Sequence, residues 1–94
     1  MAEILNDEEV AEELVSKLLE KQQLSIVVYN DDINTFEHVI YCLIKYCNHG
    51  REQAEQCAMI IHNKGKYAVK SGTSDKLIPI YAALTANKLT ANIE

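Results

Sequence analysis

The segment L-S-I-V-V-Y at residues 24–29 constrains the fold of this chain more than any other feature. It is rich in β-branched and aromatic residues, with two glutamines before it and turn-favouring residues after it, which predicts a strand. A strand needs neighbours in a sheet, and a chain of 94 residues has room for only one domain in which to find them. The rest of the sequence therefore has to supply the partner strands and the helices that cover them.

Apolar residues at helical spacing predict three helices after this strand. The first runs from a capping box at Asn34 and Glu37 to about residues 48–50, and the second covers residues 51–63 and stops at Gly65. The third begins near Asp75 or is kinked, because Pro79 is harmless only in the first helical turn. Alternation over residues 66–71 and 89–93 predicts two further strands. The expected fold class is α+β, a small antiparallel three-stranded sheet packed with three helices in the order β-α-α-β-α-β.

Residues 1–23 differ from the remainder in charge. They contain seven acidic residues and two lysines, whereas residues 24–94 contain seven of each sign, so the whole net charge of −5 lies on this leader. Its apolar residues have helical spacing, which predicts an amphipathic helix: Ile4, Ala11, Leu14, Val15, Leu18 and Leu19. We expect two parts, an acidic N-terminal extension over residues 1–23 and a folded domain over residues 24–94.

The charge pattern and hydropathy argue against several classes of protein. The neutral domain offers no basic patch to nucleic acid. No apolar run approaches the roughly 20 residues of a membrane helix, and the acidic N-terminus is unlike a signal peptide. Three cysteines, Cys42, Cys47 and Cys57, are an odd number without common zinc spacing, so they are expected as reduced core residues. These features predict a cytoplasmic protein with no metal site and no membrane or nucleic-acid partner.

Three polar residues, Asn30, Asp31 and Asp32, follow the first strand directly. On residue chemistry alone, they are best explained as caps of a turn. A carboxylate beside an amide is also a good acceptor for a cationic amine. His62, on an otherwise apolar helical face, is either a structural histidine or a contact for such a ligand. No nucleophile motif and no Gly-rich phosphate loop is present, so an enzyme with catalytic residues is not expected.

Two motifs carry a resemblance to a known family. The chain has Y-N-D-D-x-x-x-F-E-x-V-I at residues 29–40 and A-x-x-x-A-x-x-I-H-x-x-G-K at residues 54–66. Together they resemble ClpS, the adaptor of bacterial AAA+ proteases, and the match extends over residues 24–94. The resemblance implies a protein without a cofactor that recognises the N-terminal residue of a substrate, the N-degron. It also implies that such a protein delivers the substrate to the N-terminal domain of a Clp-family AAA+ unfoldase.

The resemblance also assigns roles to residues. Asn30, Asp31 and His62 would bind the free α-amino group, while Asp32 and Ile33 would shape the turn or make secondary contacts. A bulky N-terminal side chain of Leu, Phe, Tyr or Trp would enter an apolar pocket lined by Phe36, Val39, Ala58, Ile61 and Leu89.

The sequence departs from the family pattern at two places. The family commonly has Thr-Pro where Asn34 and Thr35 stand, and a methionine that restricts the pocket where Ala58 stands. Ala58 would therefore widen the pocket, so that N-terminal Ile or Val is accepted as well. A competing interpretation is an interaction domain of ribosomal stalk-like fold without an amine pocket, and a hydrolase using Asp31 and His62 ranks third.

Overall fold

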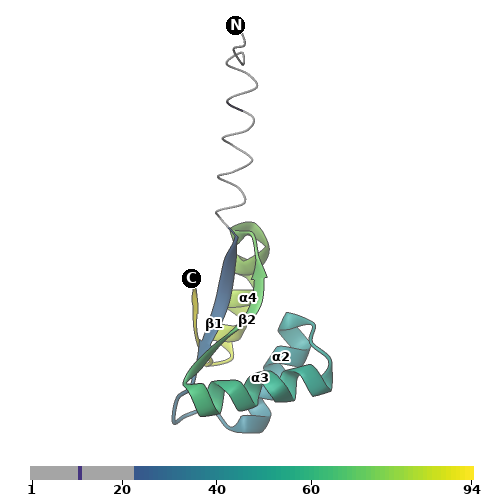
Figure 1. Ribbon diagram of the computed structural model, residues 1–94, viewed down its shortest axis with the longest axis vertical. Coiled ribbons are helices and arrows are strands. Elements are labelled where there is room, and N and C mark those ends of the chain that lie inside the picture. The colour runs from purple at the N-terminus through teal and green to yellow at the C-terminus, as the bar shows by residue number, and fades with distance from the viewer. Residues whose placement is uncertain (1–10, 12–22) are drawn as a thin grey trace, which may run out of the picture.

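The structure, a computed structural model, describes Ala11 and residues 23–94. The predicted leader helix lies outside the described residues except for Ala11. From Leu24 onward the elements follow one another in the predicted order: β1 (Leu24–Tyr29), α2 (Phe36–Cys47), α3 (Arg51–Lys64), β2 (Lys66–Gly72), α4 (Ser74–Ala86) and β3 (Thr90–Ile93) (Figure 1). The α+β fold class with three helices and three strands is confirmed over this part of the chain.

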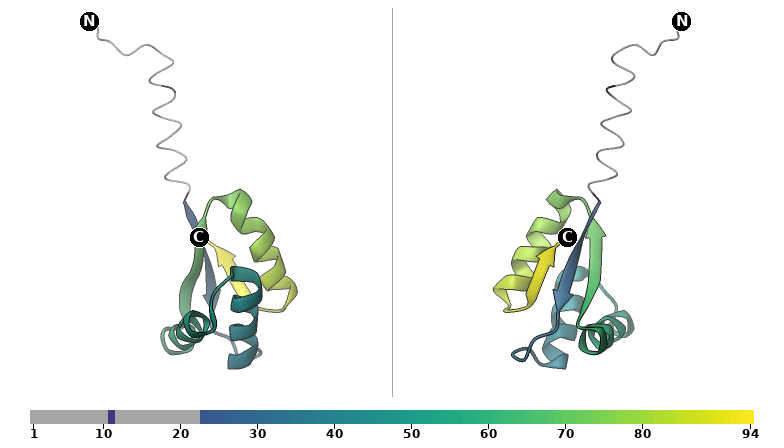
Figure 2. Two further views of the ribbon diagram at one scale, coloured as in Figure 1. Left: turned by 90° about the vertical axis from the view of Figure 1, so that its right-hand side faces the viewer. Right: turned by 60° about the vertical axis from the view of Figure 1, so that its left-hand side comes forward.

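The three strands form an antiparallel sheet in the order β2-β1-β3, with β1 in the centre. Leu24 pairs with Gly72 and Tyr29 with Lys66, with one irregularity in register between Ile26 and Val27. All three helices lie on one side of the sheet (Figure 2). Ile26 and Val28 are directed toward these helices and are 0% and 1% exposed, because successive side chains of a strand alternate between the faces.

The core lies between this face of the sheet and the helices. It is built from aliphatic side chains and the three cysteines, and its members are Ile26, Val28, Ile40, Cys42, Leu43, Cys47, Ala54, Cys57, Ala58, Ile61, Val69, Leu77, Leu84 and Leu89. The cysteines are free thiols and at most 5% exposed, as the sequence predicted. None of the helices in the described part of the chain is long and apolar enough to cross a membrane.

Helix α2 begins one residue later than the capping box had placed it. Its N-cap is Thr35, whose hydroxyl accepts a hydrogen bond from the backbone N–H of His38 at 3.1 Å. The prediction of Asn34 as the cap is wrong, because the Asn34 amide is already hydrogen-bonded to Asp31 and to the carbonyl of Lys88. The helix ends as expected at Asn48, which has φ 60° and ψ 32°.

Helix α3 ends next to the last residue of β1. Gly65 caps it in the left-handed conformation at φ 94°, and the chain then enters β2 at once. The backbone N–H of Asn30 donates to the carbonyl of Gly65 at 2.8 Å. The exit of β1 is thereby joined to the last turn of α3.

Candidate functional site

The polar residues after β1 and the histidine of α3 line one pocket. The hydrogen bond from Asn30 to Gly65 holds the strand exit against the end of α3, and His62 lies three residues before Gly65. The pocket has a volume of about 360 Å³, within the range of small-molecule sites. Its lining residues come from the turn after β1, from α2 and from α3: Asn30, Asp31, Asp32, Asn34, Phe36, Val39, Ala58, Ile61 and His62.

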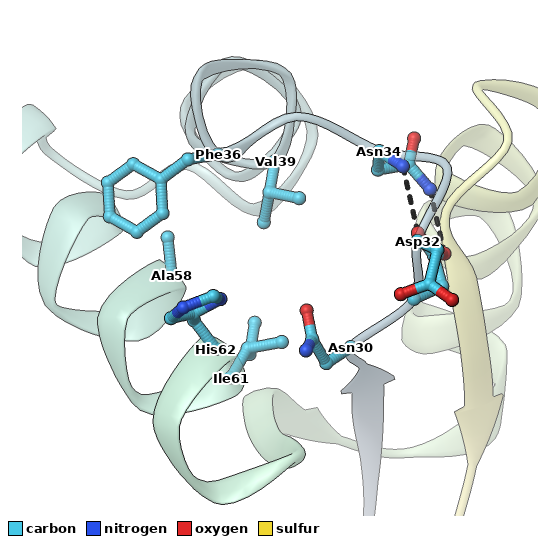
Figure 3. Close-up of a pocket in the computed structure, with 9 residues that line it drawn as sticks. Asn30, Asp32, Asn34, Phe36, Val39, Ala58, Ile61 and His62 are labelled. Atoms are coloured by element: carbon cyan, nitrogen blue, oxygen red, sulfur yellow. Dashed lines mark hydrogen bonds between the residues drawn. The ribbon is translucent and has the colours of Figure 1, made fainter.

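The pocket has a polar side and an apolar side. Asn30, Asp32 and Asn34 approach from the strand exit, while Phe36 and Ala58 lie across from them (Figure 3). Ala58 and Ile61 are buried, Val39 is half-buried, and Phe36 is 41% exposed. The apolar side therefore has a buried floor and one aromatic ring partly open to solvent.

Asp31 is the structural centre of the turn. One carboxylate oxygen, Oδ1, accepts the backbone N–H groups of Ile33 at 3.0 Å and Asn34 at 2.8 Å. The other, Oδ2, accepts the Asn34 side-chain amide at 2.8 Å and the Thr90 hydroxyl at 2.7 Å. The Asn34 backbone N–H, helped by these other donors, lowers the pKa of Asp31 to about 2.

The three polar side chains around Asp31 have no such partners. Within residues 23–94 and Ala11, no hydrogen bond is made by the side chains of Asn30, Asp32 or His62. An amide oxygen, a carboxylate and an imidazole nitrogen are all acceptors, and here all three belong to the lining of one pocket. Their positions suit a ligand that carries several hydrogen-bond donors on a cationic group.

Two residues that the sequence assigned to the site lie apart from the pocket. Ile33 is 82% exposed and is not part of its lining. Leu89 is 4% exposed and lines an adjoining void of only about 10 Å³, together with Val28 and Thr90. Leu89 therefore packs behind the pocket, where Val39 and Ile61 border both spaces.

Two residues of the site were not found from the sequence. Asn34 lines the pocket, although its position before a helix had suggested only a cap. Thr90 holds Asp31 across 59 residues of sequence, a separation that leaves no local pattern to detect. In the described ranges, residue 11 and residues 23–94, no three His, Cys, Asp or Glu side chains gather as a metal site would require.

Comparison with known proteins identifies the family. The family model described as ATP-dependent Clp protease adaptor protein ClpS matches residues 19–91. The chain belongs to the ClpS family. The structural resemblance agrees, since the Agrobacterium tumefaciens ClpS2 structure, solved bound to L-phenylalaninamide, has a TM-score of 0.72. That match is 19% identical in sequence and covers 78% of this chain and 95% of ClpS2, so it supports the ClpS fold.

Curated relatives place the ClpS sequence in two settings. The ClpS adapter of Streptomyces coelicolor is 29% identical over 51 residues, which are 54% of this chain and 53% of that protein. The ClpS adapter of Thermosynechococcus vestitus is 36% identical over 52 residues, 54% of this chain and 55% of that protein. The E3 ubiquitin-protein ligase ubr-1 of Caenorhabditis elegans is 41% identical over 54 residues, 57% of this chain but 3% of the ligase. The match thus spans about half the length of the ClpS adapters and a small part of the ligase.

Proposed function

We propose that this ClpS-family chain is a binding protein that grips the free α-amino group and the first side chain of proteins beginning with a bulky apolar residue. One observation carries the proposal. Asn30, Asp32 and His62 line the pocket without hydrogen-bond partners among the described residues, and an apolar floor lies in the same pocket. An N-terminal residue is complementary to this pocket, because it carries a cationic amine next to a side chain.

The amine would be held by hydrogen bonds. An α-ammonium group has three N–H donors, and the Asn30 amide oxygen, the Asp32 carboxylate and a neutral His62 imidazole supply three acceptors. The sequence-based assignment had given the ammonium contact to Asp31. Because four donors already occupy the Asp31 carboxylate, we assign the direct contact to Asp32 and give Asp31 the task of holding the turn.

The expected affinity follows from these contacts. Hydrogen bonds to charged groups contribute about 1.5–3 kcal/mol each. Burial of a Leu or Phe side chain adds about 2–3 kcal/mol. After the cost of immobilising the peptide is subtracted, the dissociation constant should be on the order of micromolar.

Calorimetric titration with short peptides tests this proposal. Peptides beginning with Leu or Phe should bind, and acetylation of their α-amino group should abolish binding, because the acetylated nitrogen carries no charge. The variants Asp32→Asn and His62→Ala should weaken binding. Ile33→Ala is the matched control, since Ile33 is next to Asp32 but 82% exposed and outside the pocket lining. Equal binding of free and acetylated peptides, or binding of neither, would refute the proposal.

For delivery, we propose a Clp-family AAA+ unfoldase in the cytoplasm as the partner, with contact through the N-terminal domain of the unfoldase. The match to the adaptor family model supports this partner. Titrating the isolated N-terminal domain of a Clp unfoldase into the chain should give saturable binding. Accelerated degradation of a substrate with N-terminal Leu by the complete protease should follow.

The 41% identity to the ligase ubr-1 suggests a second route for a bound substrate, which is ubiquitination. In that case the same pocket would select N-termini for ubiquitin transfer by a larger protein. Peptide binding without any binding to Clp unfoldase domains would favour this route over the protease.

A further inference from the structure

The turn that contains the proposed amine site is tied to a distant part of the chain. The Thr90 hydroxyl donates to Oδ2 of Asp31 at 2.7 Å, across 59 residues of sequence. The Asn34 side-chain amide donates to the carbonyl of Lys88 at 2.8 Å, across 54 residues. We call residues 87–90, the connection after α4 together with the first residue of β3, the α4–β3 corner. Two hydrogen bonds thus join the turn at residues 30–34 to this corner.

The corner is itself well fixed, so it can act as an anchor. The backbone N–H of Leu89 donates to the carbonyl of Leu84 at 3.1 Å, and Lys88 adopts φ 74°, the pattern of a Schellman helix end. The side chains of Leu84 and Leu89 are 0% and 4% exposed. Thr90 then pairs with Tyr29 in the sheet, directly before Asn30.

Asp31 transmits this anchoring to the residues on either side of it. Its Oδ1 holds the backbone of Ile33 and Asn34, and its Oδ2 accepts the Thr90 hydroxyl. Asn30 and Asp32 are the immediate neighbours of Asp31, and both line the pocket (Figure 3). Fixing the Asp31 carboxylate at both oxygens therefore fixes the backbone from which these two side chains project.

We propose that Thr90 is a positioning residue of the amine site, acting through Asp31 and not by contact with the ligand. This inference rests on the proposed function. Thr90 does not line the pocket of about 360 Å³, so its effect on a ligand has to pass through the turn. With the hydroxyl in place the acceptors are set before the ligand arrives, and without it part of the binding free energy is used to order the turn.

The experiment compares three variants of the full chain. Thr90→Val removes the hydroxyl but keeps the shape and the strand propensity of the residue. Thr90→Ser restores the hydroxyl. Asn92→Val is the matched control, because Asn92 is exposed on the same strand, two residues away on the same face of the sheet, and makes no side-chain hydrogen bond within the described residues.

Two readouts separate positioning from general stability. Thr90→Val should weaken the affinity for a Leu-started peptide on the order of tenfold, since a hydrogen bond to a charged group is lost. Thr90→Ser should restore the affinity to within about threefold of the original chain, and Asn92→Val should leave it unchanged. The carboxyl carbon signal of Asp31, followed by NMR during an acid titration, should show a higher pKa in Thr90→Val alone.

The outcomes distinguish this inference from the proposed function. If the original chain binds no Leu-started peptide, the proposed function fails, while the titration of Asp31 still reports whether Thr90 holds it. If the original chain binds and Thr90→Val binds equally well, or Thr90→Ser does not restore a lost affinity, Thr90 has no positioning role.

Discussion

Asp31 belongs to the pocket lining, but its carboxylate is already engaged in holding the turn. Four donors surround its carboxylate, three from the turn itself and one from β3. The sequence-based assignment gave the ammonium contact to Asp31 and the turn to Asp32, and we propose that the two aspartates have the opposite roles. The division depends on which carboxylate Thr90 reaches, and that contact exists only after β3 has paired with β1.

The lowered pKa of Asp31 makes part of the stability depend on pH. A carboxyl group whose pKa falls from 3.8 to about 2 on folding stabilises the protein above pH 4, and this contribution is lost as the pH drops toward 2. Asp31→Asn should lower the free energy of unfolding at pH 7 by about 1–2 kcal/mol. Urea denaturation at pH 7 and pH 2.5 measures both effects, and the difference between variant and original chain should shrink at the lower pH. A difference that stays constant would show that the charge of Asp31 does not stabilise the turn.

The small side chain of Ala58 determines how much space is open at the apolar side of the pocket. It is 3% exposed and lies opposite the polar residues, so a longer side chain there would extend into the space proposed for the ligand. Ala58→Met should reduce the affinity for peptides beginning with Ile or Val more than for those beginning with Leu, because β-branched side chains are wide next to the backbone. Fluorescence anisotropy with the three peptides checks this. Strong rejection of Ile and Val by the unaltered chain would contradict the wide pocket.

At the scale of the elements, the sequence predicted the ends of the helices and strands closely, but it did not predict the contacts between segments that are remote in sequence. Local signals such as the left-handed Asn48 and Gly65 ended α2 and α3 where the sequence had placed their ends. The N-cap of α2 is Thr35 and not Asn34, because the Asn34 side-chain amide is hydrogen-bonded to the carbonyl of Lys88. The corner that supplies this carbonyl is remote in sequence, so no local rule reveals it.

The end of α4 offers a direct test of the corner. Lys88 has φ 74°, a conformation that costs most residues roughly 1 kcal/mol and that glycine adopts freely. Lys88→Gly should raise the free energy of unfolding by about 0.5 kcal/mol, because glycine adopts this φ freely. The backbone carbonyl of residue 88 still accepts the Asn34 amide in this variant. Lys76→Gly, within the first turns of α4, is the control and should lower it by about 1 kcal/mol. Thermal denaturation followed by circular dichroism measures both, and a destabilised Lys88→Gly would show that the lysine side chain itself matters.

At the scale of the whole molecule, the core was the most predictable part. Periodicity predicted the strands and helices that build it, and it also predicted that all three cysteines belong to it. Pocket residues were predicted through the family resemblance, because the same apolar periodicity that marks a core residue also marks Ala58 and Ile61. Leu89 illustrates the limit, since a pattern of alternation cannot say whether a buried residue faces a pocket or packs behind it.

Burial of the cysteines predicts their reactivity. Burial raises the pKa of the Cys47 thiol to about 11, and it also raises the pKa of Cys42 and Cys57. Only thiolates react readily with disulfide reagents. In the folded protein at pH 8 all three thiols should therefore react slowly with Ellman's reagent, and in 6 M guanidinium, on the order of the concentration that unfolds stable domains, they should react at once. A thiol with equal rates in both states would show that its surroundings open without global unfolding.

The central position of β1 has a mechanical consequence. β1 pairs with a strand on each side, and its last residue, Tyr29, is followed directly by the pocket residue Asn30. Tension applied to the chain ahead of Leu24, along the strand axis, would load both hydrogen-bond ladders in shear, so that their bonds resist together. A pull from that end would act on these two ladders before it reached the turn that begins at Asn30.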